Sequence, residues 1–358
     1  MKDAALEEPR AAATHARDAH PRDADDSGPR PLDALQAPER EAEARLERAR
    51  EVGQRLLDGL RAVILGQDAA LEHVVTALLA GGHVLLEGAP GLGKTQLVRT
   101  LAGLVGGEFH RIQFTPDLMP SDVLGTSLVV AVEGGGKDLA FRPGPIFAHL
   151  VLADEINRAT PKTQSALLEA MAERQVTVEG RARPLPRPFF VLATENPIEM
   201  EGVYPLPEAQ LDRFLVKLVL EMPDLDTLAR IGARAEEPVA PGPLSSPEEL
   251  AAVQATARRV PSAPHVQRYA ARLVLATHGP SEVRFGAGPR AVQALMACAR
   301  VRALLEGRAA VAVDDVRGVA LPVLRHRLAL GFEAEAKGRR AEDVVHAVLE
   351  TTPVEEEA

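Results

Sequence analysis

The residues best suited to chemistry lie together in one glycine-rich stretch, formed by Gly88, Ala89, Pro90, Gly91, Leu92, Gly93, Lys94 and Thr95. They fit the phosphate-loop pattern G-x-x-x-x-G-K-[ST]. The glycines let several backbone N–H groups point into one hollow, and the helix that follows adds its positive end. Lys94 supplies a charge for the β- and γ-phosphates, and the Thr95 hydroxyl can bind Mg²⁺. The stretch predicts a nucleotide site, with Gln96 as a further contact.

Two adjacent carboxylates, Asp154 and Glu155, form the second candidate. They follow an apolar run typical of a buried strand. A carboxylate at the tip of a parallel strand beside a phosphate loop can hold Mg²⁺ through water, and a second one can polarise the attacking water. An apolar strand followed by Asp-Glu is common by itself. Its position sixty residues after Lys94 (154 − 94) in an alternating chain strengthens the prediction.

Three further polar residues could complete the site, and each has an ordinary alternative. Asn196 follows another apolar run and could hydrogen-bond the γ-phosphate or orient the water, although an Asn before proline is also a common turn former. Arg213 could pair with Asp212 or Glu208 on the surface, or face the nucleotide of a neighbouring subunit. Arg290 lies at a predicted helix start, where a cation opposes the helix dipole, so a phosphate-facing role is considered beside the ordinary alternative of plain solvation.

The elements that must position these residues alternate between strand and helix patterns. Buried-strand patterns lie at 83–87, 150–153, 189–194 and 216–220. A short apolar stretch ahead of the phosphate loop, containing Leu65 and Gly66, could hold the adenine base, or could be a plain turn between helices. Two hairpins are predicted, at about 127–142 and 176–188.

Composition divides the 358 residues into modules and excludes some functions. Residues 1–42 lack apolar periodicity and predict a disordered tail. A nucleotide-binding domain is expected over 43–222. Only helical patterns follow, so an all-helical module is expected over 223–350, with an acidic tail at 351–358.

The formal net charge of −10 argues against a general nucleic-acid binder, because phosphate backbones attract basic surfaces. The start of the chain has no signal-like apolar stretch, and no run of about 18 apolar residues exists, so we expect a cytoplasmic protein without a membrane span. The single cysteine, Cys298, is expected to pack in a helical core.

Taken in order, these motifs resemble those of the AAA+ ATPases, and within them the MoxR family, from about residue 43 to about residue 350. Five motifs carry the resemblance: Gly-Ala-Pro-Gly-Leu-Gly-Lys-Thr at 88–95, Ala-Asp-Glu-Ile-Asn-Arg-Ala at 153–159, Ala-Thr-Glu-Asn-Pro at 193–197, Pro-Glu-Ala-Gln-Leu-Asp-Arg-Phe at 207–214 and Gly-Pro-Arg-Ala at 288–291. Leu-Arg-His-Arg at 324–327 is also similar. It implies an α/β fold, in which an AAA+ P-loop αβα parallel-sheet core is followed by an all-helical lid domain.

The resemblance also implies roles and partners. It makes Lys94 and Thr95 the Walker A contacts, Asp154 and Glu155 the Walker B pair, Asn196 sensor 1, Arg290 sensor 2 and Arg213 a finger acting in trans. The two hairpins would be inserts facing the pore of a ring, which we expect to be a hexamer. Such a ring would hydrolyse ATP with Mg²⁺ to remodel partner proteins or insert a cofactor into them, and it would associate with a von Willebrand factor A-type partner.

Two rival functions remain at this point. A nucleic-acid motor would need Arg181, Arg183 and Arg187 of the second hairpin, but no aromatic stacking platform accompanies them. A nucleotide-gated scaffold with negligible turnover would not need the intact Asp154-Glu155 pair.

Overall fold

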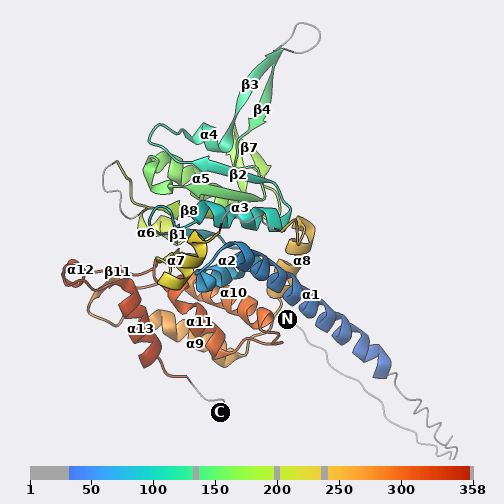
Figure 1. Ribbon diagram of the computed structural model, residues 1–358, viewed down its shortest axis with the longest axis vertical. Coiled ribbons are helices and arrows are strands. Elements are labelled where there is room, and N and C mark those ends of the chain that lie inside the picture. The colour runs from blue at the N-terminus through green and yellow to red at the C-terminus, as the bar shows by residue number, and fades with distance from the viewer. Residues whose placement is uncertain (1–31, 132–136, 197–201, 235–240, 355–358) are drawn as a thin grey trace, which may run out of the picture. The chain divides into compact units, whose positions relative to one another are not determined.

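A computed structural model of the chain describes residues 32–131, 137–196, 202–234 and 241–354 (Figure 1). Its contacts divide the chain into Met1–Ala42 and Glu43–Ala358, and the account below concerns the second unit. Most of the predicted N-terminal tail and residues 355–358 lie outside the described residues. Helix α1 (Leu32–Val63) begins earlier than the predicted start at residue 43, so a disordered tail reaching to 42 was wrong for 32–42. These residues are mostly Leu, Ala, Gln, Glu and Arg, which favour a helix even without an apolar stripe.

A parallel sheet in the order β2-β5-β8-β1-β9 forms the centre of the nucleotide-binding region. Its strands are β1 (Val84–Glu87), β2 (Phe109–Gln113), β5 (Leu150–Asp154), β8 (Phe190–Glu195) and β9 (Val216–Val219). The four predicted strands are confirmed, whereas β2 was missed. Only Ile112 of β2 is buried, because β2 is an edge strand, so it lacks the continuous apolar run that marks the inner strands.

Helices cover both faces of this sheet, because successive strand residues point to opposite sides. Leu86 packs in one apolar cluster with α1, α2 (Asp68–Ala80) and α3 (Lys94–Val105). Its neighbour Leu85 packs in a second cluster with α4 (Pro120–Leu124) and α5 (Pro161–Glu173). The result is the expected three-layer αβα core.

Both predicted hairpins are confirmed. The first pairs β3 (Gly125–Ala131) with β4 (Lys137–Pro143), and its tip at 132–136 lies outside the described residues. The second pairs β6 (Gln175–Val178) with β7 (Arg181–Pro184). The two hairpins contact each other, since the Ser127 hydroxyl donates to Glu179 Oε2 at 2.8 Å and the Arg183 guanidinium lies 3.8 Å from the Phe141 ring centroid.

The C-terminal region is mostly helical. Its helices are α7 (Leu225–Gly232), α8 (Pro247–Ala257), α9 (Pro264–Ala276), α10 (Pro289–Leu305), α11 (Val313–Leu324), α12 (Phe332–Ala336) and α13 (Ala341–Thr351). A small antiparallel sheet joins β10 (Val283–Phe285) to β11 (Ala329–Leu330), so the all-helical prediction was wrong there. Helix α11 ends at Leu324, and the polar residues after it turn back toward the core.

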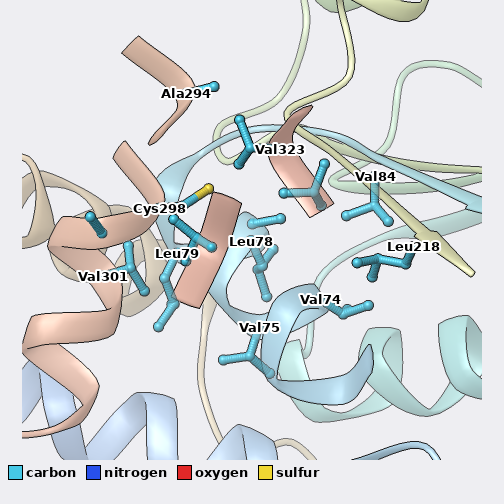
Figure 2. Packing of buried hydrophobic residues seen from close by; sticks show 14 of the residues in the cluster. Val74, Val75, Leu78, Leu79, Val84, Leu218, Ala294, Cys298, Val301 and Val323 are labelled. Carbon is cyan, nitrogen blue, oxygen red and sulfur yellow. The ribbon is translucent and has the colours of Figure 1, made fainter. Parts of the chain in front are cut away.

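The two regions share one apolar interior (Figure 2). Leu78 and Leu79 of α2 pack against α10 and α11, and Val84 and Leu218 approach from the sheet. Cys298 of α10 is fully buried in this cluster, which confirms its predicted packing role. Within the described part of the chain, no helix has the length and apolar character to cross a membrane.

Candidate functional site

The phosphate loop lies between the end of β1 at Glu87 and the start of α3 at Lys94. Gly91 and Gly93 have φ angles of 86° and 80°, and no heavy atom lies within 4 Å of the position a Cβ would take at either residue. The backbone therefore bends around open space, as a phosphate cradle requires. Lys94 Nζ reaches across this space and donates to the Gly88 carbonyl at 2.5 Å and to the Glu195 carbonyl at 3.3 Å.

A hollow of about 480 Å³ adjoins the loop. Leu65, a predicted adenine contact, lines this hollow together with Leu92 and Gln96. Gly66 does not line it, but its φ of 74° and its closeness to Thr227 allow α7 to approach, because a Cβ there would come within 2.8 Å of Thr227 Cγ2. Gly66 therefore shapes the hollow without lining it.

The far wall of this hollow comes from a part of the chain that sequence analysis left unassigned. Met222, Leu228 and Ile231, on α7 and the segment before it, line it, and their side chains are 69%, 41% and 42% exposed. Apolar side chains that face open space beside a phosphate loop suit the flat faces of a purine base. Arg234 holds this segment to α1 by donating to the Val63 carbonyl at 2.8 Å.

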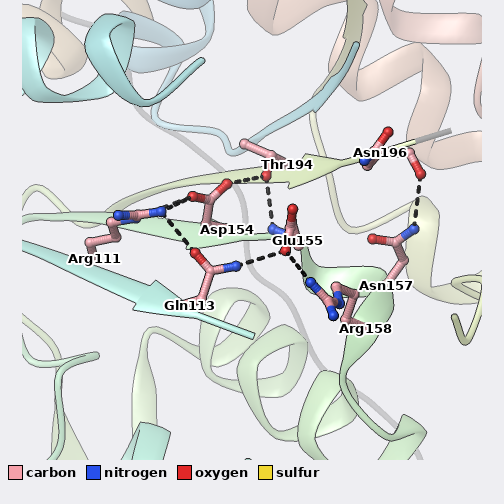
Figure 3. A network of polar contacts seen from close by, with 8 residues as sticks. All are labelled: Arg111, Gln113, Asp154, Glu155, Asn157, Arg158, Thr194 and Asn196. Atoms are coloured by element: carbon pink, nitrogen blue, oxygen red, sulfur yellow. Dashed lines mark hydrogen bonds and ion pairs between the residues drawn. The ribbon is translucent and has the colours of Figure 1, made fainter. Parts of the chain in front are cut away.

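Asp154 ends β5 and is nearly enclosed, with 7% of its surface exposed (Figure 3). Its Oδ2 accepts from Arg111 Nε at 3.1 Å and from Arg111 Nη2 at 2.7 Å. Its Oδ1 accepts from the Thr194 hydroxyl at 2.7 Å. Both carboxylate oxygens thus have partners that the sequence patterns did not identify.

Glu155 follows with a φ of 57°, a left-handed conformation that costs free energy for a residue with a side chain. Its backbone N–H donates to the same Thr194 hydroxyl at 2.8 Å. Its Oε2 accepts from Gln113 Nε2 at 2.8 Å and from Arg158 Nη1 at 3.0 Å. Since Arg111 Nη2 also donates to Gln113 Oε1 at 2.8 Å, one polar network holds both carboxylates (Figure 3).

Asn196 directly follows β8 and lies at the same sheet edge as the phosphate loop, because Glu195 pairs with Glu87 in the parallel register. It is buried, and its carbonyl accepts from Asn157 Nδ2 at 3.5 Å. Lys217 Nζ lies 2.6 Å from Glu87 Oε2 and 4.0 Å from Glu195 Oε2. Burial raises the pKa of Glu195, while Lys217 lowers it.

Arg213 and Arg290 lie at the other end of the sheet. They line a recess with Gly82 and His83, which precede β1, whereas the phosphate loop follows β1. Arg213 Nη1 donates to the Leu168 carbonyl at 2.7 Å, and Arg290 Nη1 lies 3.6 Å from Asp212 Oδ2. The structure brings these two arginines together but does not bring them to the phosphate loop of the same chain.

A buried residue anchors the segment that carries Arg213. The Arg327 side chain is 3% exposed, and its Nε donates to Asp212 Oδ1 at 2.8 Å. Its other nitrogens donate to the carbonyls of Phe214 at 2.7 Å and Leu215 at 3.1 Å. The surrounding Leu-Arg-His-Arg belongs to the resemblance to the AAA+ ATPases, but no local pattern predicts these contacts.

The donor set suits Mg²⁺ rather than a softer metal. A Thr95 hydroxyl and an Asp154 carboxylate are hard oxygen ligands, and Mg²⁺ at nucleotide sites takes few protein ligands beside phosphate and water. No cluster of three or more His, Cys, Asp or Glu side chains suited to a metal occurs among the residues that the structure describes, so a site built from protein ligands alone is not found there.

Comparisons with known proteins agree with this arrangement. The profile of the "ATPase family associated with various cellular activities (AAA)" matches residues 83–216, and the "AAA lid domain" matches residues 275–348. "Chaperone MoxR1" of Mycobacterium tuberculosis is 43% identical over 314 residues, covering 83% of this chain and 81% of that protein. The chain belongs to the MoxR family of AAA+ ATPases.

Other MoxR-family proteins are similar over comparable lengths. "Protein MoxR" of Methylorubrum extorquens is 34% identical over 357 residues, covering 90% of this chain and 98% of that protein. The crystal structure of a putative ATPase from Cytophaga hutchinsonii superposes with a TM-score of 0.81 at 35% identity, covering 89% of this chain and 99% of that one. These matches confirm the predicted family and the fold of an AAA+ core with a lid domain.

Proposed function

We propose that this MoxR-family chain hydrolyses ATP with Mg²⁺ in a closed ring of copies, which we expect to be a hexamer, and that each active site is shared by two neighbours. The observation that supports the shared site is the separation of its parts. The phosphate loop follows β1, whereas Arg213 and Arg290 lie beside the residues that precede it. A four-residue strand spans roughly 13 Å, so these arginines can serve a phosphate loop best in an adjacent copy.

Each residue of the proposed site has a physical task. The loop amides and Lys94 bind the phosphates, and Mg²⁺ would be held by Thr95 and Asp154, where it offsets phosphate charge. Glu155 polarises the attacking water, and Asn196 orients it against the γ-phosphate. The hollow between Leu65 and Leu228 takes the adenine.

Arg111 competes with Mg²⁺ for the Asp154 carboxylate. Arg111 occupies Oδ2 with two hydrogen bonds, whereas Oδ1 accepts one from Thr194 and keeps a further lone pair for Mg²⁺ or a water bound to it. Arg111 is half-exposed at 47%, so its guanidinium has water to turn into. Partners from β2 thus hold both acidic side chains, Arg111 at Asp154 and Gln113 at Glu155.

We propose that the ring acts on a partner protein, its client. One similar protein is named a chaperone, which supports a remodelling or maturation role. The first hairpin presents Leu128, Val129 and Leu139, which are 43%, 65% and 59% exposed. Exposed apolar side chains on a projecting hairpin suit transient contact with a client, or with a von Willebrand factor A-type partner.

Single substitutions in the proposed site should separate ATP binding from ATP hydrolysis. Lys94→Ala should abolish ATP binding, whereas Glu155→Gln should bind ATP and lose turnover. Arg213→Ala should bind ATP and assemble but hydrolyse it slowly, because a trans arginine contributes roughly 10³-fold or more. Arg259→Ala, an exposed arginine of the lid region, is the control and should resemble the wild type. Wild-type turnover in Arg213→Ala would reject the shared site.

Two further measurements, phosphate release and retention on DNA, test the two rival functions. Absence of phosphate release from the wild-type ring would favour a nucleotide-gated scaffold. Salt-sensitive retention on DNA would favour a nucleic-acid motor. Arg183, one of the arginines that a motor would need, lies over Phe141.

A further inference from the structure

The recess that contains Arg213 and Arg290 is unusually rich in cations. It has a volume of about 310 Å³ and lies where α5 ends and where β1 and β9 begin. Four arginines line it: Arg174, Arg213, Arg290 and Arg327. Among the described residues that line it, Asp212 carries the one carboxylate. This concentration of positive charge stands in a chain whose formal net charge is −10.

The partners of these arginines leave most of the charge uncompensated. Asp212 is shared between Arg327 at 2.8 Å and Arg290 at 3.6 Å. Arg213 and Arg174 instead donate to neutral carbonyls, those of Leu168 at 2.7 Å and Gly81 at 2.9 Å. Like charges held together without anions repel each other, so an anionic ligand would stabilise the recess.

Arg174 is the member of this group that no motif identifies, and its backbone is held in place. It ends α5 with a φ of 54°, where its N–H donates to the Ala170 carbonyl at 2.9 Å and its own carbonyl accepts from Leu185 N–H at 3.0 Å. Glycine is the usual residue at such a left-handed position. An arginine here costs conformational free energy, so a benefit elsewhere is expected.

The surroundings of Arg174 point in the same direction. Only its Nη2 is engaged, by the Gly81 carbonyl, which leaves other N–H donors of the planar guanidinium available. Burial lowers its pKa, and nearby Arg258 and Arg187 lower it further. A guanidinium held beside other cations, with donors to spare, is suited to oxygen atoms of a phosphate.

We propose that Arg174 is a third arginine contacting the nucleotide phosphates bound by the neighbouring copy, together with Arg213 and Arg290. The inference rests on the proposed shared active site and adds to it a residue from a different element, the end of α5. The ordinary alternative is that Arg174 only complements the negative end of the α5 dipole. The two readings differ in whether a neighbour's turnover depends on Arg174.

Arg174→Gly tests the proposal without straining the fold, because glycine adopts the left-handed conformation freely. We expect it to retain the melting temperature and ATP affinity of the wild type while turnover falls about tenfold to a hundredfold, the effect of losing one charge-assisted hydrogen bond. Arg174→Lys should recover part of this loss. Arg258→Ala, which removes a nearby cation that does not line the recess, should keep full turnover.

Mixing the impaired Arg174→Gly variant with the inactive Lys94→Ala variant decides whether Arg174 acts on the neighbour. Arg174→Gly keeps an intact phosphate loop, and Lys94→Ala keeps an intact recess. Random mixing in a ring pairs the intact halves at about a quarter of the interfaces, so activity should exceed that of either variant alone. No recovery, or wild-type turnover in Arg174→Gly, would overturn the proposal.

Arg213→Ala mixed with Lys94→Ala serves as the reference. Recovery with Arg213→Ala but not with Arg174→Gly would reject the role of Arg174 and leave the shared site standing. Recovery with neither would reject the shared site itself.

Discussion

Replacing Arg327 by methionine should weaken both the fold and the shared active site. The Arg327 side chain is almost fully buried and donates to Asp212 and to the carbonyls of Phe214 and Leu215. Methionine keeps much of the apolar stem but provides no donor. The carbonyl of Leu215 would then lose this donor, Asp212 would keep only Arg290 at 3.6 Å, and the carbonyl of Phe214 would keep only its contact with His326 Nε2 at 3.2 Å.

The size of the loss follows from these contacts. Breaking a buried ion pair by removing one partner typically costs about 3–5 kcal/mol. Asp212 is 28% exposed, so water replaces part of the lost interaction, and we expect a loss near the lower limit, about 3 kcal/mol. For a chain of this size that corresponds to a fall in melting temperature of roughly 4 °C.

Hydrolysis should fall further than stability alone explains. The anchored segment carries Arg213, so its release should lower kcat about tenfold or more while ATP affinity stays unchanged, because the phosphate loop lies at the opposite end of β1. Scanning calorimetry, ATP titration and phosphate release measure the three quantities.

Arg317→Met is the matched control, because Arg317 lies on α11 and makes a single contact of 3.3 Å with the Tyr269 hydroxyl. It should cost about 1 kcal/mol or less and leave turnover intact. The reasoning is refuted if Arg327→Met melts like the wild type, or if it melts earlier but hydrolyses ATP at the wild-type rate.

Three other perturbations test separate parts of the structure. Burial lowers the pKa of His83 from 6.5 to about 4, so between these pH values the unfolded chain binds more protons than the folded one. The free energy of unfolding should therefore fall by roughly 3 kcal/mol from this residue as the pH drops from 6.5 to 4. In His83→Asn the urea midpoint should decline less over this pH range, and an unchanged decline would contradict the assignment. Burial raises the pKa of the Cys298 thiol to about 12, so a thiol reagent should label it only as the chain unfolds, and rapid labelling of folded protein would be inconsistent with this packing. Gly93→Ala places a Cβ in the phosphate hollow at a φ of 80°. The loss of ATP-binding free energy should be much larger than the loss of folding free energy, which we expect to be roughly 1 kcal/mol. Undiminished ATP affinity would argue against the phosphate cradle.

Local patterns predicted the inner strands because these strands are buried on both faces and therefore appear as continuous apolar runs. The same patterns missed β2, where only Ile112 is buried, and with it Arg111 and Gln113, the partners of Asp154 and Glu155. They also left Leu228 and Ile231 unassigned, since exposed apolar residues acquire meaning only beside the phosphate loop.

The sequence by itself determined the phosphate loop, the acidic strand tip and the family, because these depend on residues close together along the chain or in a recognisable order. Only the tertiary structure decided that Arg174, Arg213 and Arg290 share one recess, far from the phosphate loop of their own chain. Their grouping depends on how α5, the segment before β9 and α10 pack together. Contacts between residues so distant in sequence leave no local pattern from which they could be predicted.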